Sequence, residues 1–263
     1  MQEVSASGPN ADRIEAAAKE QLAGTYAFVV PRDSIFFLPK EAMQDAVLAQ
    51  VPEAADISIS RSSFTTLEIA AASRTKAFVW CGVAVDRPMP DGSCYEADSG
   101  GLIYARIGGA AESVAAGTTV ITDTANADDA ATTPSAGVAP SVSAPGALQN
   151  GDLLVYSALD RELGEGQSPI GARVVRAASM PDALRFVEAV EFLNVPVVSL
   201  VLRDDEADLW VNDSTRITYV IGREESAAQL AASVIPKLDL LDGTIQYLDL
   251  RFNGKAYLKR YGE

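Results

Sequence analysis

The sequence predicts an α+β protein in which a small unit with two helices precedes a mixed β-sheet unit that also carries two helices. The chain up to Trp80 reads as a strand, two helices and three strands. Further strand-like runs follow, interrupted by two amphipathic segments of helical period. The chain ends on two β-prone runs around Asn253-Gly254, which is a strong hairpin signal because a type I′ turn needs positive φ at both central residues.

The first unit begins with a short strand over Val4–Ser7, followed by a Gly-Pro turn. The next helix ends by Gly24 and places Ile14, Ala18 and Leu22 on one face, at the i, i+4, i+8 spacing of a buried helix side. Pro39 is well suited to begin a second helix over Lys40–Gln50. Two helices packed on one face of a small sheet make a sensible two-layer unit.

Three strands complete this unit. They contain the alternating pair Ile57 and Ile59, the alternating run Leu67–Ala71, and the apolar run Lys76–Trp80. A new all-β pattern then starts with a hairpin over Tyr95–Ala105. We therefore expect a domain boundary near Gly82, with domains over residues 1–82 and 83–263.

The second unit carries an insertion over about residues 108–150. This segment is dominated by Ala, Ser, Thr, Gly and Pro and lacks aromatic residues. It cannot bury enough apolar area to offset its ordering entropy, so its centre, about Asn126 to Ala147, should be disordered or loosely held. The sheet should resume at Asp152–Tyr156.

The remaining elements follow in regular order. Ser179 and Pro181 begin a helix, and a later helix should run from Glu224 to Leu238. The later helix offers Leu230, Val234 and Leu238 as its core stripe. Three strands lie between the two helices, over Val197–Arg203, Ala207–Asn212 and Arg216–Ile221.

The terminal hairpin closes the sheet. Its second arm, from Lys255 onward, has no later strand with which to pair, so it is either an edge strand or lies beside an earlier one. An edge strand offers unpaired N–H and C=O groups to another chain.

Charge and composition exclude several functions. The net charge of −15 argues against a nucleic-acid or anionic-membrane binder, because both need clustered Lys and Arg. The chain contains no histidine, which removes the commonest general base and the usual transition-metal ligand. It also lacks a signal-peptide pattern and an apolar run long enough to cross a bilayer, so we expect either a soluble protein or one from which an N-terminal anchor was removed.

The remaining chemical motifs are weak. Asp204-Asp205-Glu206 and Asp128-Asp129 fall in expected turns or disorder, where acidic residues keep the chain solvated, and the EF-hand spacing is missing. Trp80 and Trp210 are expected to be core anchors rather than ligand-stacking residues. We therefore expect no enzyme activity, no cofactor and no metal site.

The two cysteines, Cys81 and Cys94, are too few to hold zinc without histidine. Two interpretations stay open. In an oxidising compartment they would form a disulfide that adds roughly 3 kcal/mol of stability. Otherwise they are two reduced thiols in the core.

Several stretches together resemble a known family. They are Thr66-Leu67-Glu68-Ile69, the Ala77-Phe78-Val79-Trp80 run, the Asp98–Ala105 segment, the Pro169-Ile170-Gly171 loop and the terminal Tyr247–Ala256 run. The chain up to Trp80 resembles a POTRA domain, a strand-helix-helix-strand-strand module. In the order and spacing of these stretches, most of the chain outside the insertion is similar to the bacterial cell-division protein family FtsQ, also called DivIB. Thr75 stands where this family usually has proline, and the family's cytoplasmic tail and membrane helix are absent, which suits an extracytoplasmic fragment.

The resemblance implies a non-enzymatic scaffold of the bacterial divisome. It would sit on the extracytoplasmic face of the cell membrane at the division septum, held by an N-terminal anchor absent from this chain. Its POTRA domain would meet other divisome membrane proteins, and its terminal strand would take an extended segment of an FtsB-like protein, itself bound to an FtsL-like protein, by β-strand addition. The positions that match this binding site are Arg251, Phe252, Asn253, Gly254, Lys255, Ala256, Tyr257 and Leu258.

Two other functions remain open. One is a different POTRA-containing protein of secretion or outer-membrane assembly, and the other is an unrecognised hydrolase or binding protein. The hairpin also has a plainer interpretation, in which Lys255, Lys259 and Arg260 only keep a solvated edge from aggregating.

Overall fold

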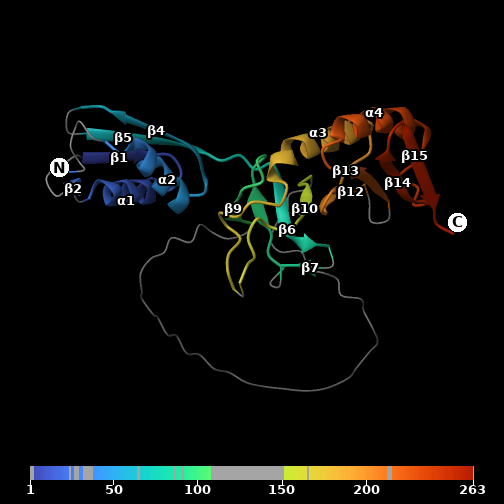
Figure 1. Ribbon diagram of the computed structural model, residues 1–263, viewed down its shortest axis with the longest axis horizontal. Helices are drawn as coiled ribbons and strands as arrows, with labels where there is room; N and C mark the ends of the chain where they lie inside the picture. Colours follow the sequence, from blue (N-terminus) through green and yellow to red (C-terminus); the bar gives the residue numbers. More distant parts are fainter. Residues whose placement is uncertain are drawn as a thin grey trace, which may run out of the picture.

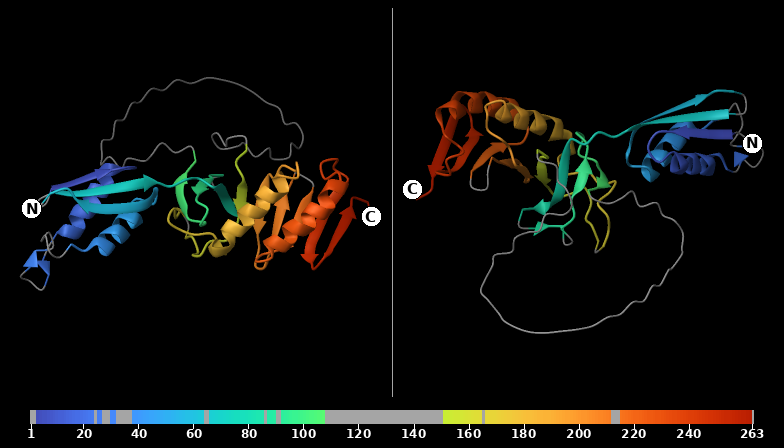
Figure 2. Two further views of the ribbon diagram at one scale, coloured as in Figure 1. Left: turned by 90° about the horizontal axis from the view of Figure 1, so that it is seen from above. Right: turned by 180° about the vertical axis from the view of Figure 1, so that it is seen from behind.

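The computed structural model describes residues 3–23, 25–26, 30–31, 38–63, 66–85, 87–89, 92–107, 151–164, 166–211 and 215–262. In these ranges the protein is mixed α+β, with four α-helices and two main sheets. Figures 1 and 2 show two units that follow one another along the long axis, with the chain termini at opposite ends. We call residues 3–73 the N-terminal unit and residues 77–262 the C-terminal unit.

The N-terminal unit is a three-stranded sheet covered on one face by two helices (Figure 1). Its strands stand in the order β1-β5-β4, with β1 parallel and β4 antiparallel to the central β5. A two-stranded pair, β2 with β3, lies between the helices in sequence. The elements are β1 Glu3–Ser7, α1 Ala11–Leu22, β2 Thr25–Tyr26, β3 Val30–Pro31, α2 Lys40–Gln50, β4 Ala54–Arg61 and β5 Thr66–Ser73.

The face expected for the first helix is confirmed, whereas of the second helix's apolar positions only Met43 and Val47 are buried. Ile14, Ala18 and Leu22 of α1 are buried, as are Met43 and Val47 of α2. They form one core with the inward residues of the sheet, because alternate residues of a strand point to the same face.

The C-terminal unit is built on a ten-stranded mixed sheet. Its strand order is β15-β14-β13-β12-β11-β10-β6-β8-β9, and β7 pairs with β6 beside this path. The strands are β6 Phe78–Ala84, β7 Arg87–Pro88, β8 Tyr95–Ala97, β9 Ile103–Arg106, β10 Leu154–Tyr156, β11 Ser199–Leu202, β12 Glu206–Trp210, β13 Arg216–Val220, β14 Ile245–Phe252 and β15 Lys255–Arg260.

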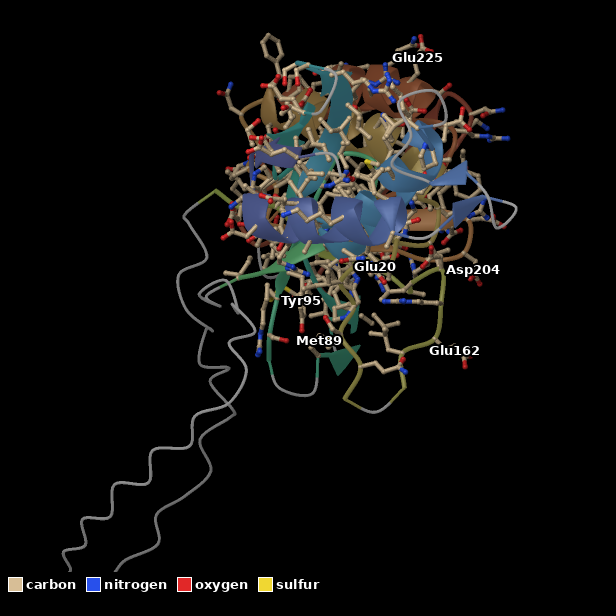
Figure 3. The ribbon with its side chains drawn as sticks, turned by 90° about the vertical axis from the view of Figure 1, so that its left-hand side faces the viewer. Glu20, Met89, Tyr95, Glu162, Asp204 and Glu225 are labelled. Carbon is tan, nitrogen blue, oxygen red and sulfur yellow. A yellow bond between two sulfur atoms is a disulfide. The ribbon has the colours of Figure 1, made fainter. Side chains whose placement is uncertain are left out.

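Two helices, α3 Met180–Glu191 and α4 Glu224–Val234, cover one face of this sheet (Figures 1 and 2). Phe186 of α3 and Tyr219 of β13 meet edge to face, with ring centroids 4.6 Å apart, in the core between the layers. In Figure 3, Glu225 at the start of α4 and Met89 beside β7 lie at opposite sides of the molecule. The helix layer and the β6–β7 hairpin therefore lie on opposite sides of the C-terminal unit.

The strand expected over Lys76–Trp80 does not belong to the N-terminal sheet. As β6, it pairs with β8 and β10, and its Phe78 and Trp80 lie in the core of the C-terminal unit. The division between the two sheets and their two cores thus falls between Ser73 and Phe78 rather than near Gly82.

The stripe expected for the later helix, Leu230, Val234 and Leu238, packs against the core but is not its buried centre. Ala227 and Ala231 are the buried apolar residues of α4, whereas Leu230 and Val234 are only partly buried. The regular helix ends at Val234, and a 3₁₀ turn over Ile235–Lys237 follows, where Pro236 cannot supply a helical N–H.

The insertion over residues 108–150, including Asp128-Asp129, lies outside the described residues.

Candidate binding site at the C-terminal edge strand

Strand β15 is the last strand of the large sheet on one side. It follows β14 through Asn253-Gly254, and Phe252 lies opposite Lys255 across this turn. Gly254 has a positive φ of 66°, but the φ of Asn253 is not positive. A type I′ turn needs positive φ at both residues, so the turn is not the expected type I′. β14 carries irregularities of register on both sides of its centre, and such bulges add the twist that a type I′ turn would otherwise supply.

The hydrogen-bonding direction of β15 can be read from its far end. The N–H of Tyr261 donates to the carbonyl of Thr244, so it points toward β14. Because backbone groups alternate in direction along an antiparallel strand, Lys259, Tyr257 and Lys255 share this orientation. The N–H and C=O groups of Ala256, Leu258 and Arg260 therefore point away from the sheet, where a further strand could pair with them.

Several apolar side chains are exposed along this edge, beside the charged Lys255, Lys259 and Arg260. Phe252 and Tyr257 are each 50% exposed, and their rings meet edge to face with centroids 4.9 Å apart. Leu258 is also exposed, whereas Ala256 packs against the core beneath the helices. Exposed aromatic and aliphatic side chains next to unpaired backbone groups are a favourable place for an extended chain to bind.

Arg251 is held in place within the protein. Its Nε and Nη2 donate to the two carboxylate oxygens of Asp249 at 2.9 and 2.5 Å, and its Nη1 donates to Glu206 Oε1 at 2.6 Å. These hydrogen bonds raise the pKa of Arg251, the bonds to Asp249 having the largest effect. The bidentate contact fixes the guanidinium in one plane on the face of the sheet opposite the helices.

A second cluster lies on the same face. Asp208 is buried and accepts a hydrogen bond from Thr218 Oγ1 at 2.6 Å, and Arg203 Nη2 lies 2.7 Å from its carboxylate. Arg216 lies 3.7 Å from the same carboxylate and 5.7 Å from the ring centroid of Tyr247. The two clusters balance acidic against basic side chains and brace β12, β13 and β14 behind the edge strand.

The pKa of Asp249 is lower than that of a free aspartate. Burial raises it, but the hydrogen bonds that Arg251 donates from its side chain and backbone outweigh burial. A carboxylate with a depressed folded pKa adds stability that is fully present above its unfolded pKa, about 4. That stability is lost as the pH falls through the lower, folded pKa.

We therefore expect acid below about pH 4 to destabilise the C-terminal unit partly through Asp249. Asp249→Asn should lower stability at neutral pH and show a smaller further loss on acidification than the wild type. Urea unfolding at neutral and acidic pH, followed by tryptophan fluorescence, measures both. Equal losses on acidification in the two proteins would contradict this role.

The structure brings most of the expected binding residues together at one edge. Arg251 and Ala256 are half-buried, and the other six are exposed at the end of β14, on the turn and on β15. Sequence reasoning missed Asp249 and Glu206, which hold Arg251. Tyr247, Asp249 and Arg251 are two residues apart along one strand, so their side chains share one face of the sheet. This spacing could have indicated that Asp249 contacts Arg251. Glu206 is 45 residues from Arg251, and it was interpreted only as a solvated turn residue.

Cys81 and Cys94 form a disulfide, with their Cα atoms 4.3 Å apart. Both are buried on the side of β6 away from the helices, together with Val79. The bond joins the middle of β6 to the residue before β8, far along the sheet from β15.

Within the described residues, no three His, Cys, Asp or Glu side chains gather in a way that could hold a metal ion. The helices described here are also too short or too polar to cross a bilayer. A groove of about 530 Å³ separates α4 from the β14–β15 hairpin, and its walls include Leu230, Phe252 and Asn253.

A scan against models of protein families finds no match for this chain, and a search of curated proteins finds no similar sequence.

Proposed function

We propose that this chain is the extracytoplasmic part of a division scaffold of the FtsQ type, which binds an extended segment of an FtsB-like partner by adding it to β15. The observation that carries the proposal is the outward orientation of the backbone of Ala256, Leu258 and Arg260 at the end of the sheet. Main-chain pairing would supply affinity, and the exposed Phe252, Tyr257 and Leu258 would supply selectivity.

The N-terminal unit supports the same proposal. Apart from the β2–β3 pair, its order is strand, helix, helix, strand, strand, which is the order of a POTRA domain. In this proposal that unit meets other divisome membrane proteins, and an FtsL-like protein reaches the complex through the FtsB-like partner. The scaffold lies outside the cell membrane at the septum, performs no catalysis and needs no cofactor.

The test replaces Leu258 with proline. Its N–H points away from β14, so the change removes a donor offered to the partner while leaving the hairpin's own pairing in place. We expect at least about tenfold weaker binding of the extracytoplasmic segment of the organism's own FtsB-like protein, the equivalent of about 1.4 kcal/mol. Isothermal titration calorimetry with the full chain measures it.

Two variants make the result specific. Leu258→Ala removes the side chain but keeps the donor, so it should bind more tightly than the proline variant. Tyr257→Pro removes an inward donor and should also weaken the hairpin, which thermal unfolding would reveal. Unchanged binding by a folded Leu258→Pro protein would refute strand addition at this edge.

A further inference from the structure

Arg74 lies in the short link between the two units and contacts both of them. On the side of the N-terminal unit, its Nε donates to the carbonyl of Pro52 at 3.0 Å and its Nη2 to the carbonyl of Ala54 at 2.7 Å. Its backbone N–H donates to the carbonyl of Glu53 at 2.8 Å. The carbonyls of Pro52 and Ala54 thus fix the direction of the guanidinium, and that of Glu53 holds the backbone of Arg74.

The third side-chain contact crosses to the C-terminal unit. Arg74 Nη1 pairs with Asp98 Oδ2 in the β8–β9 turn. The other carboxylate oxygen of Asp98 accepts hydrogen bonds from the N–H groups of Gly100 at 2.9 Å and Leu102 at 3.0 Å. The carboxylate is therefore as firmly held as the guanidinium that meets it.

The β8–β9 turn is itself anchored to the C-terminal core. Gly101 has φ of 76°, and a Cβ at this position would lie 2.6 Å from the side chain of Val174. The Val174 N–H donates to the Gly101 carbonyl at 3.0 Å. A contact made to Asp98 is thus transmitted to the body of the C-terminal unit rather than to a free loop.

The Arg74–Asp98 ion pair is largely buried. The side chains of Arg74 and Asp98 are each only 15% exposed, so neither charge is well solvated if its partner is removed. Breaking one partner of a buried ion pair is much more disruptive than breaking a surface pair. By contrast, Arg176 and Asp205, which pair within the C-terminal unit, are 45% and 79% exposed.

We propose that the Arg74–Asp98 pair is an orientation lock, which holds the N-terminal unit in one position on the C-terminal unit and releases it when either charge is lost. The lock needs the planar, multiply donating guanidinium of an arginine and a carboxylate. The one guanidinium donates hydrogen bonds to two carbonyls of the N-terminal unit and to an acidic group of the C-terminal unit. The lock does not depend on the proposed function, since it concerns the relation between the units and not the β15 edge.

Single-molecule energy transfer tests the lock. Dyes are attached to unnatural amino acids at the exposed positions Glu41 in α2 and Phe192 after α3, which avoids labelling cysteines. The wild type should give one narrow distribution of transfer efficiency. Asp98→Asn keeps the acceptor for Gly100 and Leu102 but removes the charge, and it should lose the narrow distribution.

Arg74→Lys is the second variant, because it keeps the positive charge without the fork, and it should also broaden the distribution. Asp205→Asn removes an ion pair within one unit and should leave the wild-type distribution unchanged. If Asp98→Asn disturbs its turn, as judged by circular dichroism, Arg74→Lys decides the question. A narrow wild-type distribution in folded Arg74→Lys, or a broad one in the wild type itself, would overturn the proposal.

Discussion

Replacing Trp80 with alanine should lower the free energy of unfolding of the C-terminal unit by about 3–5 kcal/mol. Trp80 is 1% exposed in β6, an interior strand of the large sheet, and its ring packs near Tyr95 with centroids 6.2 Å apart. Its Nε1–H donates to the carbonyl of Ser157 at 2.9 Å. The change therefore leaves both a cavity and an unsatisfied buried carbonyl.

Tryptophan fluorescence can follow the unfolding of the Trp80→Ala variant. The chain has only two tryptophans, so Trp210 in β12 is the single fluorophore of its kind in the variant, and it reports on the C-terminal unit alone. Trp80→Phe is the matched control, because it keeps most of the packing and loses the hydrogen bond. Urea unfolding should place it between the wild type and Trp80→Ala. A loss below about 1 kcal/mol for Trp80→Ala would mean that the site collapses around the smaller side chain.

Loss of the disulfide should have the next largest effect. Cys81 and Cys94 are 13 residues apart, and in the chain-entropy model a bond closing a loop of this size stabilises the folded state by about 3 kcal/mol. The double variant with alanine at both positions should lose about this amount, because the unfolded chain regains the entropy of the open loop.

The measurement compares urea unfolding of the C-terminal unit in the wild type, with and without reductant, and in the double variant. Reductant should destabilise the wild type and leave the double variant unchanged. The N-terminal unit, which contains neither cysteine, should unfold at the same urea concentration in all of these proteins. Equal stability of oxidised and reduced wild type would show that the bond does not constrain the unfolded chain.

Local patterns predicted the elements well. The spacing of Ile14, Ala18 and Leu22 identified the buried face of α1, and the Asn-Gly pair placed the hairpin that ends the sheet. In each case the structure is determined by residues close in sequence, through helical period or turn chemistry. The sequence left open whether the last strand was an edge or lay beside an earlier strand, and the order of the sheet places β15 at an edge.

Features of the structure that depend on residues far apart in the sequence could not be predicted from local patterns. The run that forms β6 reads as a strand, but its choice of sheet depends on pairing with β10, which lies on the far side of the insertion. In α4 the larger apolar residues were expected to be the buried ones, yet the alanines are fully buried and the larger residues only partly so, which depends on how the helix sits on distant strands. The link from Arg251 to Glu206 likewise exists only once β12 and β14 are both in the sheet.

The three-residue strand β10 has a consequence for how the protein opens. It is the single element through which β6, β8 and β9 join β11 to β15 in the described sheet, and it pairs in parallel with both neighbours over three residues each. Such a short ladder holds the two parts of the sheet with few hydrogen bonds. Amide hydrogen exchange reports openings of this kind, which need not unfold the whole protein. We expect protection from exchange to be lower across β10 than in the longer ladders on either side of it, although one hydrophobic core spans both parts of the sheet.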